Sequence, residues 1–168
     1  SEFVLQLAKI YRYILQSRER ELVALEIELQ FVQQYCGLLQ TRFGEALRIC
    51  FTIPDDDKER LVAPVTLQTL IENAVKHNVV QKNQPLYLEI FTEKIADGKN
   101  AADEERRALV VENTLQPRSL VETSNKQGLA NVQALYAHLC PAAPVRIEIR
   151  RVGEKIPSEV FRVSVPLL

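Results

Sequence analysis

The spacing of apolar residues changes near residue 45, and this change constrains the fold more than any other feature of the sequence. Before it, apolar residues recur every three or four positions, as they do along one side of an α-helix. One series predicts a helix ending near Gln16, and its members are Phe3, Leu7, Ile10 and Ile14. A second predicts a helix ending near Gly44, a residue suited to a left-handed cap, and its members are Leu22, Leu25, Leu29, Val32, Cys36 and Leu39. We therefore expect a helical hairpin over residues 1–44 whose apolar seam is completed by dimerisation.

After residue 45 the pattern is typical of an α/β domain. Apolar and polar residues alternate, as in half-buried strands, over residues 47–51, 86–91, 108–111, 145–150 and 160–165. The alternation puts Val145, Ile147 and Ile149 on the inward side of the fourth strand. We expect the acidic turn at Pro54–Asp57 to be exposed to solvent.

Helices are expected in two parts of this domain. Pro64 can open one that runs to about Asn78, and a second covers residues 128–139 before Pro141. The predicted fold is therefore α+β: a two-layer α/β sandwich with a mixed, mostly antiparallel sheet of about five strands, covered by helices on one face and preceded by the hairpin.

Composition excludes several classes of function. The chain carries 21 basic and 22 acidic residues, mixed along its length, so we expect no binding to nucleic acid. No apolar run approaches the roughly 18 residues of a membrane span. Three cysteines, odd in number and far apart, suit buried thiols in a reducing compartment. Since the chain opens at Ser1 inside a helix and contains no methionine, we expect it to be part of a longer protein.

The strongest candidate for chemistry is the polar side of the helix over residues 67–78. Glu72, Asn73, Lys76 and His77 share this side, opposite an apolar stripe. On pattern alone, a solvated face with a Glu72–Lys76 pair is the simpler interpretation. The same groups would also suit a magnesium–nucleotide site, since Mg²⁺ prefers oxygen ligands and phosphate requires cations. The long irregular stretch over 114–127 precedes a helix N-terminus, a position that favours anions.

The sequence resembles the LytS-type sensor histidine kinases, which have the Bergerat nucleotide-binding fold. The resemblance extends over nearly the whole chain. The matching segments are Tyr11-Arg12-Tyr13, Leu22 to Leu29, Arg42-Phe43-Gly44, the Asn box from Pro64 to His77, the first glycine-box strand Val110-Val111-Glu112-Asn113, and the second glycine box Gly128-Leu129-Ala130-Asn131-Val132.

By this resemblance, the chain would bind ATP and Mg²⁺ through the Asn box. Asn73 would coordinate the metal ion, Glu72 would be the base or polariser for the attacking histidine, and Lys76 and His77 would face the phosphates.

The two glycine boxes would complete the nucleotide site. The second would receive phosphate, and its residues are Gly128, Leu129 and Asn131. In the first, Asn113 stands where the family has the adenine-reading aspartate, and the two glycines that follow are absent. Residues 114–127 would form the lid over ATP.

The resemblance also implies a place in a signalling pathway. The chain would be the catalytic domain (residues 45–168) and partial dimerisation hairpin (residues 1–44) of a homodimeric two-component kinase, in the cytoplasmic portion of an inner-membrane sensor. It would phosphorylate a histidine upstream of Ser1 for relay to the receiver domain of a response regulator. Because the acceptor would be missing, the fragment would be inactive alone; His138 reads as a surface residue. Two alternatives remain open: a degenerate dimerising module without turnover, and an ATPase of the same fold.

Overall fold

The computed structural model describes residues 2–17, 22–95, 106–117, 126–153 and 158–168. Its helices are α1 (Glu2–Ser17), α2 (Leu25–Phe43), the 3-10 turns η1 (Gly44–Ala46) and η2 (Asp55–Asp57), α3 (Thr66–His77) and α4 (Lys126–Leu139). Its strands are β1 (Val23–Ala24), β2 (Leu47–Thr52), β3 (Leu61–Val62), β4 (Leu86–Lys94), β5 (Arg107–Thr114), β6 (Arg146–Val152) and β7 (Ser158–Pro166). The expected loop over 95–107 and the lid over 114–127 fall mostly outside the described residues.

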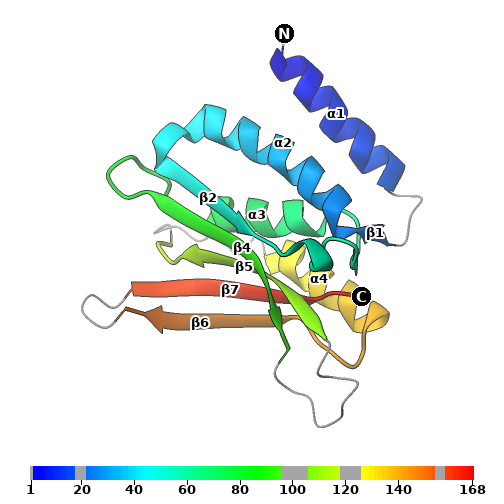
Figure 1. The fold of residues 1–168 in the computed structure, drawn as a ribbon. Coiled ribbons are helices and arrows are strands. Elements are labelled where there is room, and N and C mark those ends of the chain that lie inside the picture. Colours follow the sequence, from blue (N-terminus) through cyan, green and yellow to red (C-terminus); the bar gives the residue numbers. More distant parts are fainter. Residues whose placement is uncertain (1, 18–21, 96–105, 118–125, 154–157) are drawn as a thin grey trace.

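Five strands form one mixed sheet in the order β2-β4-β5-β7-β6 (Figure 1). β2 pairs with β4 in parallel, and the other three pairings are antiparallel. This arrangement confirms the predicted sheet. A second, two-stranded sheet joins β1 to β3, and the backbone of Leu168 pairs with that of Leu61 next to it. This small sheet was not predicted, because strands of two residues carry no readable alternation.

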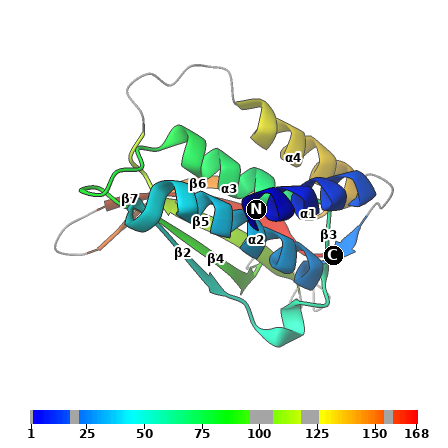
Figure 2. The ribbon, with the colours of Figure 1, turned by 90° about the horizontal axis from the view of Figure 1, so that it is seen from above.

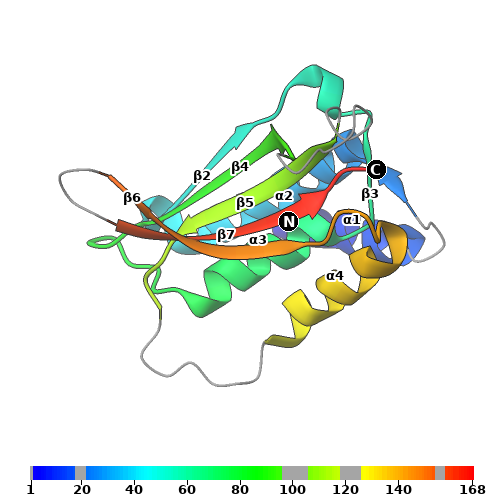
Figure 3. The same cartoon turned by 90° about the horizontal axis from the view of Figure 1, so that it is seen from below.

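The hydrophobic core lies between the five-stranded sheet and helices α2, α3 and α4, which gather on one side of it (Figure 3). Alternate residues of β4, β5 and β7 point into this core; they include Leu88, Ile90, Leu109, Val111, Val163 and Val165. The structure therefore confirms the predicted two-layer α+β sandwich. The boundary at residue 44 between hairpin and catalytic domain stays a prediction.

Helix α1 packs on α2, away from the sheet (Figure 2). Of its predicted seam, Ile10 is buried, while Phe3 and Leu7 remain exposed. Val4, Leu5 and Tyr11 are exposed as well. Among the described side chains of α1, which end at Tyr13 and so leave out Ile14, Ile10 is thus fixed to the rest of the chain and much of the apolar surface faces outward.

Three local predictions were wrong. Ile147 and Ile149 are exposed, Ile149 by 61%, although they lie on the helix side of the sheet: β6 is an edge strand that the helices do not cover. Helix α3 begins at Thr66, after Val65 in the left-handed conformation (φ 69°), so Pro64 precedes the helix. Cys50 is exposed, since it sits on the outward side of edge strand β2.

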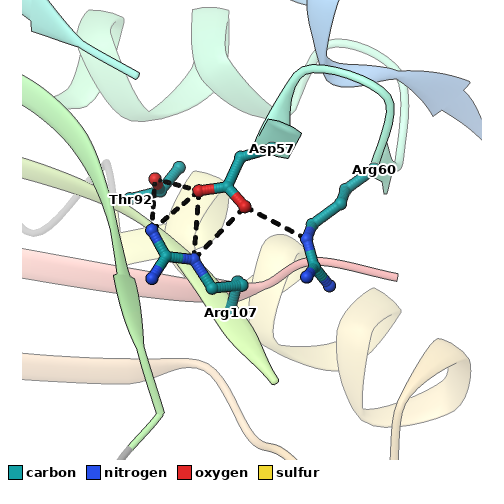
Figure 4. A network of polar contacts seen from close by, with 4 residues as sticks. All are labelled: Asp57, Arg60, Thr92 and Arg107. Atoms are coloured by element: carbon teal, nitrogen blue, oxygen red, sulfur yellow. Dashed lines mark hydrogen bonds and ion pairs between the residues drawn. The ribbon is translucent and has the colours of Figure 1, made fainter. Parts of the chain in front are cut away.

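The acidic turn after β2 was also misread, because Asp57 is only 4% exposed (Figure 4). Arg107 donates to its carboxylate from two nitrogens: Nη2 to Oδ2 at 2.7 Å, and Nε to Oδ2 at 3.0 Å and to Oδ1 at 3.2 Å. Arg60 donates at 3.1 Å, and Thr92 donates through its hydroxyl. Burial opposes ionisation, but these hydrogen bonds and charges hold the pKa of Asp57 below its ordinary value. The network ties the turn to strands β4 and β5.

Candidate functional site

The polar side of α3 is presented as the sequence predicts. Its apolar stripe is buried in the core: Leu67, Leu70, Ile71, Ala74 and Val75. Glu72 and Lys76 are exposed, and Asn73 and His77 are half-buried. In the described part of the chain, no ion pair joins Glu72 to Lys76, so the pair expected of a simple solvated face is not formed.

Helix α4 brings the second glycine box against this helix. A Cβ atom on Gly128 would lie 3.7 Å from Cγ2 of Thr69, one helical turn before Asn73. Gly128 lies in the first turn of α4, which begins at Lys126, two residues earlier than predicted. The first four N–H groups of a helix have no partner within it, and here they include those of Gly128 and Leu129. These donors therefore lie in the turn of α4 that is next to α3.

Asn131 lies on the exposed surface of α4. Its side chain is exposed, and its Oδ1 accepts a hydrogen bond from Nε2 of Gln127 at 2.9 Å. The residues of α4 that are buried are Val132 and Tyr136. Nucleotide binding by Asn131 stays a prediction. Within the second glycine box, the residue whose backbone lies against α3 is Gly128.

Asn113 lies in the sheet beneath α3. It is 2% exposed and sits on β5 between Leu88 of β4 and Phe161 of β7, on the side that faces the helices. Its Nδ2 donates to the carbonyl oxygen of Thr114 at 2.8 Å, which fixes the orientation of the amide. Among the described residues its Oδ1 has no hydrogen-bond partner, so the acceptor atom is the one left for a ligand.

Two buried side chains that sequence patterns did not single out hold the N-terminal end of α3. Glu28 of α2, 0% exposed, accepts from the backbone N–H of Leu67 at 3.3 Å and from the hydroxyl of Tyr13 on α1. Tyr136 of α4 contacts Thr66 Oγ1 at 2.8 Å and accepts from the N–H of Ala63 at 2.9 Å. A charged residue within the apolar series of α2 was the signal that could have revealed Glu28.

Burial dominates the titration of the groups around α3. It raises the pKa of Tyr136 to about 12. It also raises the pKa of Tyr35, on α2, to about 12, and the negative charge of Glu72 adds to that rise. The charge of Glu72 on α3 therefore acts on a tyrosine of α2.

The C-terminal end of α3 is joined to the chain that leaves β5. Oδ1 of Asn78 accepts from the backbone N–H of Gln116 at 2.9 Å, and Nε2 of Gln116 donates to the carbonyl oxygen of Val79 at 2.7 Å. Asn78 is buried, and its Nδ2 donates to the carbonyl oxygen of Ala74 at 2.8 Å. Sequence patterns carried no sign of this connection, which links segments far apart in the chain.

The described residues fit a metal ion only together with a bound ligand. Within them, no cluster of three or more His, Cys, Asp or Glu could hold a metal. Asn73 offers one amide oxygen, a donor that Mg²⁺ accepts, and phosphate and water would have to complete the coordination. A hollow of about 280 Å³ lies on the opposite face of the sheet, lined by residues such as Arg146 and Glu148, and none of the predicted site residues borders it.

Comparison with known proteins agrees with the sequence resemblance. The family model for histidine kinases matches residues 1–47. The chain is 40% identical over 85 residues to the sensor protein LytS of Bacillus cereus, covering 51% of this chain and 14% of that protein. It is 32% identical over 83 residues to the sensor histidine kinase/phosphatase LytS of Staphylococcus aureus, covering 49% and 14%. The aligned part spans about one seventh of the length of these relatives.

Solved structures agree with the predicted fold. Two nucleotide-free forms of the catalytic domain of histidine kinase ThkA align with a TM-score of 0.53 each. They are 12% and 14% identical and cover 87% and 86% of this chain, and 97% and 94% of theirs. At such identity the likeness concerns the fold alone. Together, the comparisons confirm the resemblance to LytS-type sensor histidine kinases, and the fold is the α+β sandwich of histidine kinase catalytic domains.

No helix among the described residues has both the length and the apolar character needed to cross a membrane.

Proposed function

We propose that this chain binds Mg-ATP and is the catalytic region of a two-component sensor histidine kinase. It would phosphorylate a histidine upstream of Ser1, for relay to the receiver domain of a response regulator. The observation that carries this proposal is the close approach of Gly128 to Thr69, which lies one helical turn before Asn73. It sets beside α3 the first turn of α4, whose N–H groups have no partner within the helix.

Charges and donors around this contact suit a triphosphate. The N–H groups of Gly128 and Leu129 would receive phosphate oxygens with the help of the helix dipole. Lys76 and His77, in the last turn of α3, would add donors, and Asn73 would hold Mg²⁺ through its amide oxygen. The bound metal would neutralise charge on the phosphates, which is the main requirement of phosphoryl transfer.

Asn113 would read the base. Because Nδ2 is engaged by the carbonyl of Thr114, Oδ1 is the atom presented to a ligand, and an oxygen acceptor matches the amino group of adenine. An amide oxygen makes a weaker hydrogen bond than a carboxylate, so we expect lower affinity than an aspartate would give.

Glu72 would act on the attacking histidine. It is exposed on α3, and its charge acts on Tyr35 of α2, so its carboxylate would be available to accept the proton of an incoming imidazole. The acceptor histidine would come from the longer protein, and the chain by itself would not autophosphorylate.

The exposed apolar residues of α1 suit a second copy of the hairpin. Phe3, Val4, Leu7 and Tyr11 form a surface that a homodimer would bury. In this proposal the hairpin dimerises, and the catalytic region sits on the cytoplasmic side of an inner-membrane sensor.

A second candidate is a degenerate signalling module that dimerises without turnover. The missing glycines after Asn113 favour it, since Leu115 and Pro117 stand in their places. An ATPase of the same fold is a third candidate; a histidine in the longer protein just before residue 1 would argue against it.

Calorimetric titration of the chain with a non-hydrolysable ATP analogue, with Mg²⁺ and with EDTA, tests the proposal. We expect binding that requires Mg²⁺. Absence of both heat and thermal stabilisation at millimolar nucleotide would contradict it and favour the degenerate module.

A further inference from the structure

The chain leaving β5 is fastened to the end of α3 by side chains as well as by backbone. Asn78, Val79, Gln84 and Gln116 form this connection, which we call the 78–116 clasp. The side chain of Gln116 donates to two carbonyl oxygens, those of Val79 at 2.7 Å and Gln84 at 2.9 Å. Its backbone donates to Asn78 Oδ1 at 2.9 Å and accepts from the N–H of Val79 at 2.8 Å.

The clasp leaves little freedom to the segment that follows Asn113. Leu115 donates its N–H to the carbonyl of Glu159 at 2.9 Å, so β7 holds one side of the segment. Pro117 has a fixed φ and forms an isolated bridge with Asn78. Residues 115–117 are thus held between β7 and the end of α3.

The two ends of the clasp adjoin different parts of the candidate site. Asn113, whose Oδ1 is the atom left for a ligand, lies three residues before Gln116. Lys76 and His77 immediately precede Asn78, which caps α3 and binds back to Ala74. The clasp therefore connects the segment that carries Asn113 to the end of α3 that carries Lys76 and His77.

We propose that Asn78 and Gln116 are positioning residues of the nucleotide site, which hold the adenine-reading Asn113 and the phosphate-facing end of α3 at one separation. This inference rests on the proposed function. Preorganisation of this kind favours ligands that engage both positions at once, because the protein does not have to be ordered when they bind. In this proposal the degenerate first glycine box has a structural role, because the side chain of Gln116 makes the hydrogen bonds that fix residues 115–117.

The test compares Gln116→Ala with Gln84→Ala, each titrated with three probes. Gln116→Ala removes the two side-chain bonds of the clasp, whereas Gln84→Ala removes an exposed side chain and leaves its carbonyl acceptor in place. The probes are a magnesium-bound non-hydrolysable ATP analogue, adenosine, and magnesium tripolyphosphate. Hydrogen exchange at the amides of Val79 and Gln116 reports whether the clasp has opened.

For Gln116→Ala we expect faster exchange at both amides and about tenfold weaker binding of the ATP analogue, with adenosine and tripolyphosphate unaffected. Gln84→Ala should match the wild type throughout. Unchanged exchange, unchanged affinity for the analogue, or an equal loss with all three probes would overturn the positioning role while leaving nucleotide binding intact. A wild-type protein that binds none of the probes would overturn the proposed function, and the inference with it.

Discussion

The hydroxyl of Tyr13, on α1, donates a hydrogen bond to the buried carboxylate of Glu28, on α2. The same carboxylate accepts from the backbone of Leu67 at the start of α3. Three helices therefore meet at one side chain, and Val65 takes up its left-handed conformation beside it. Because a β-branched residue is strained at positive φ, the surrounding contacts must hold it there.

Loss of the Tyr13 hydroxyl should weaken this junction. We expect Tyr13→Phe to lower the free energy of unfolding by about 1 to 3 kcal/mol, the cost of leaving a buried polar group without a partner, because Glu28 loses a donor in a buried position. Urea denaturation measures the change. Tyr11→Phe is the matched control, since Tyr11 is exposed on the same helix. Equal stability of the two variants would refute the role of the Tyr13 bond.

Glu28 should make stability fall as pH rises. Burial raises its pKa above the ordinary value of 4.5, although hydrogen bonds from Tyr13 and the backbone at 65–67 act in the opposite direction. The folded state thus binds the proton more tightly than the unfolded state. The contribution of Glu28 to the free energy of unfolding is complete below pH 4.5 and is lost as pH rises through the folded pKa. Glu28→Gln cannot ionise, so the variant should lack this pH dependence in urea titrations; parallel pH profiles would disprove it.

Asp57 should act in the opposite pH direction. Its folded pKa lies below the ordinary value of 3.8, so its contribution is present above that pH and is lost on acidification through the folded pKa. Asp57→Asn leaves Arg107 without its anionic partner, and we expect a loss of about 3 to 5 kcal/mol near neutral pH. Asp55→Asn is the control, because Asp55 is an exposed carboxylate in the same turn. Thermal unfolding that responds equally to both substitutions would count against the network in Figure 4.

Gly128 should lower the stability of α4 and allow a ligand to approach the backbone closely. A Cβ would meet Thr69 at an ordinary contact distance, so Gly128→Ala fits and should stabilise α4 by about 0.5 to 1 kcal/mol. The added methyl would stand where phosphate must approach the backbone, so nucleotide affinity should fall. Gly37→Ala is the control: it lies within α2 with open space around it and should stabilise without affecting binding. If Gly128→Ala binds nucleotide as tightly as Gly37→Ala, the phosphate position is wrong.

Periodicity was sufficient for the elements that pack on the core. Leu67, Leu70 and Ile71 on α3, like Leu86 and Leu88 on β4, are buried as their spacing predicts. Periodicity could not predict the order of the strands in the sheet. Ile147 and Ile149 alternate like core residues, yet β6 lies at an edge where no helix covers them. An alternating pattern predicts on which face of the sheet a residue lies. Whether its side chain is buried depends on which elements, distant in sequence, pack on that face.

The candidate site was predicted where its residues lie close together in one segment. The polar side of α3 is such a case. The contacts that hold α3 in place join residues 39 to 73 positions apart, such as Glu28 with Leu67 and Tyr136 with Ala63. Sequence patterns within one helix carry no information about such partners. The same holds for Asn78 and Gln116, 38 positions apart.

Magnesium-dependent nucleotide binding by matched asparagine variants tests the central claim most directly. Asn73→Ala removes the amide oxygen assigned to the metal ion, whereas Asn83→Ala removes an exposed asparagine from the segment before β4. Each is titrated calorimetrically with a non-hydrolysable ATP analogue, with Mg²⁺ and with EDTA. The account predicts that the wild type and Asn83→Ala bind more tightly with Mg²⁺, and that Asn73→Ala loses this gain. Equal magnesium dependence in all three proteins would contradict it.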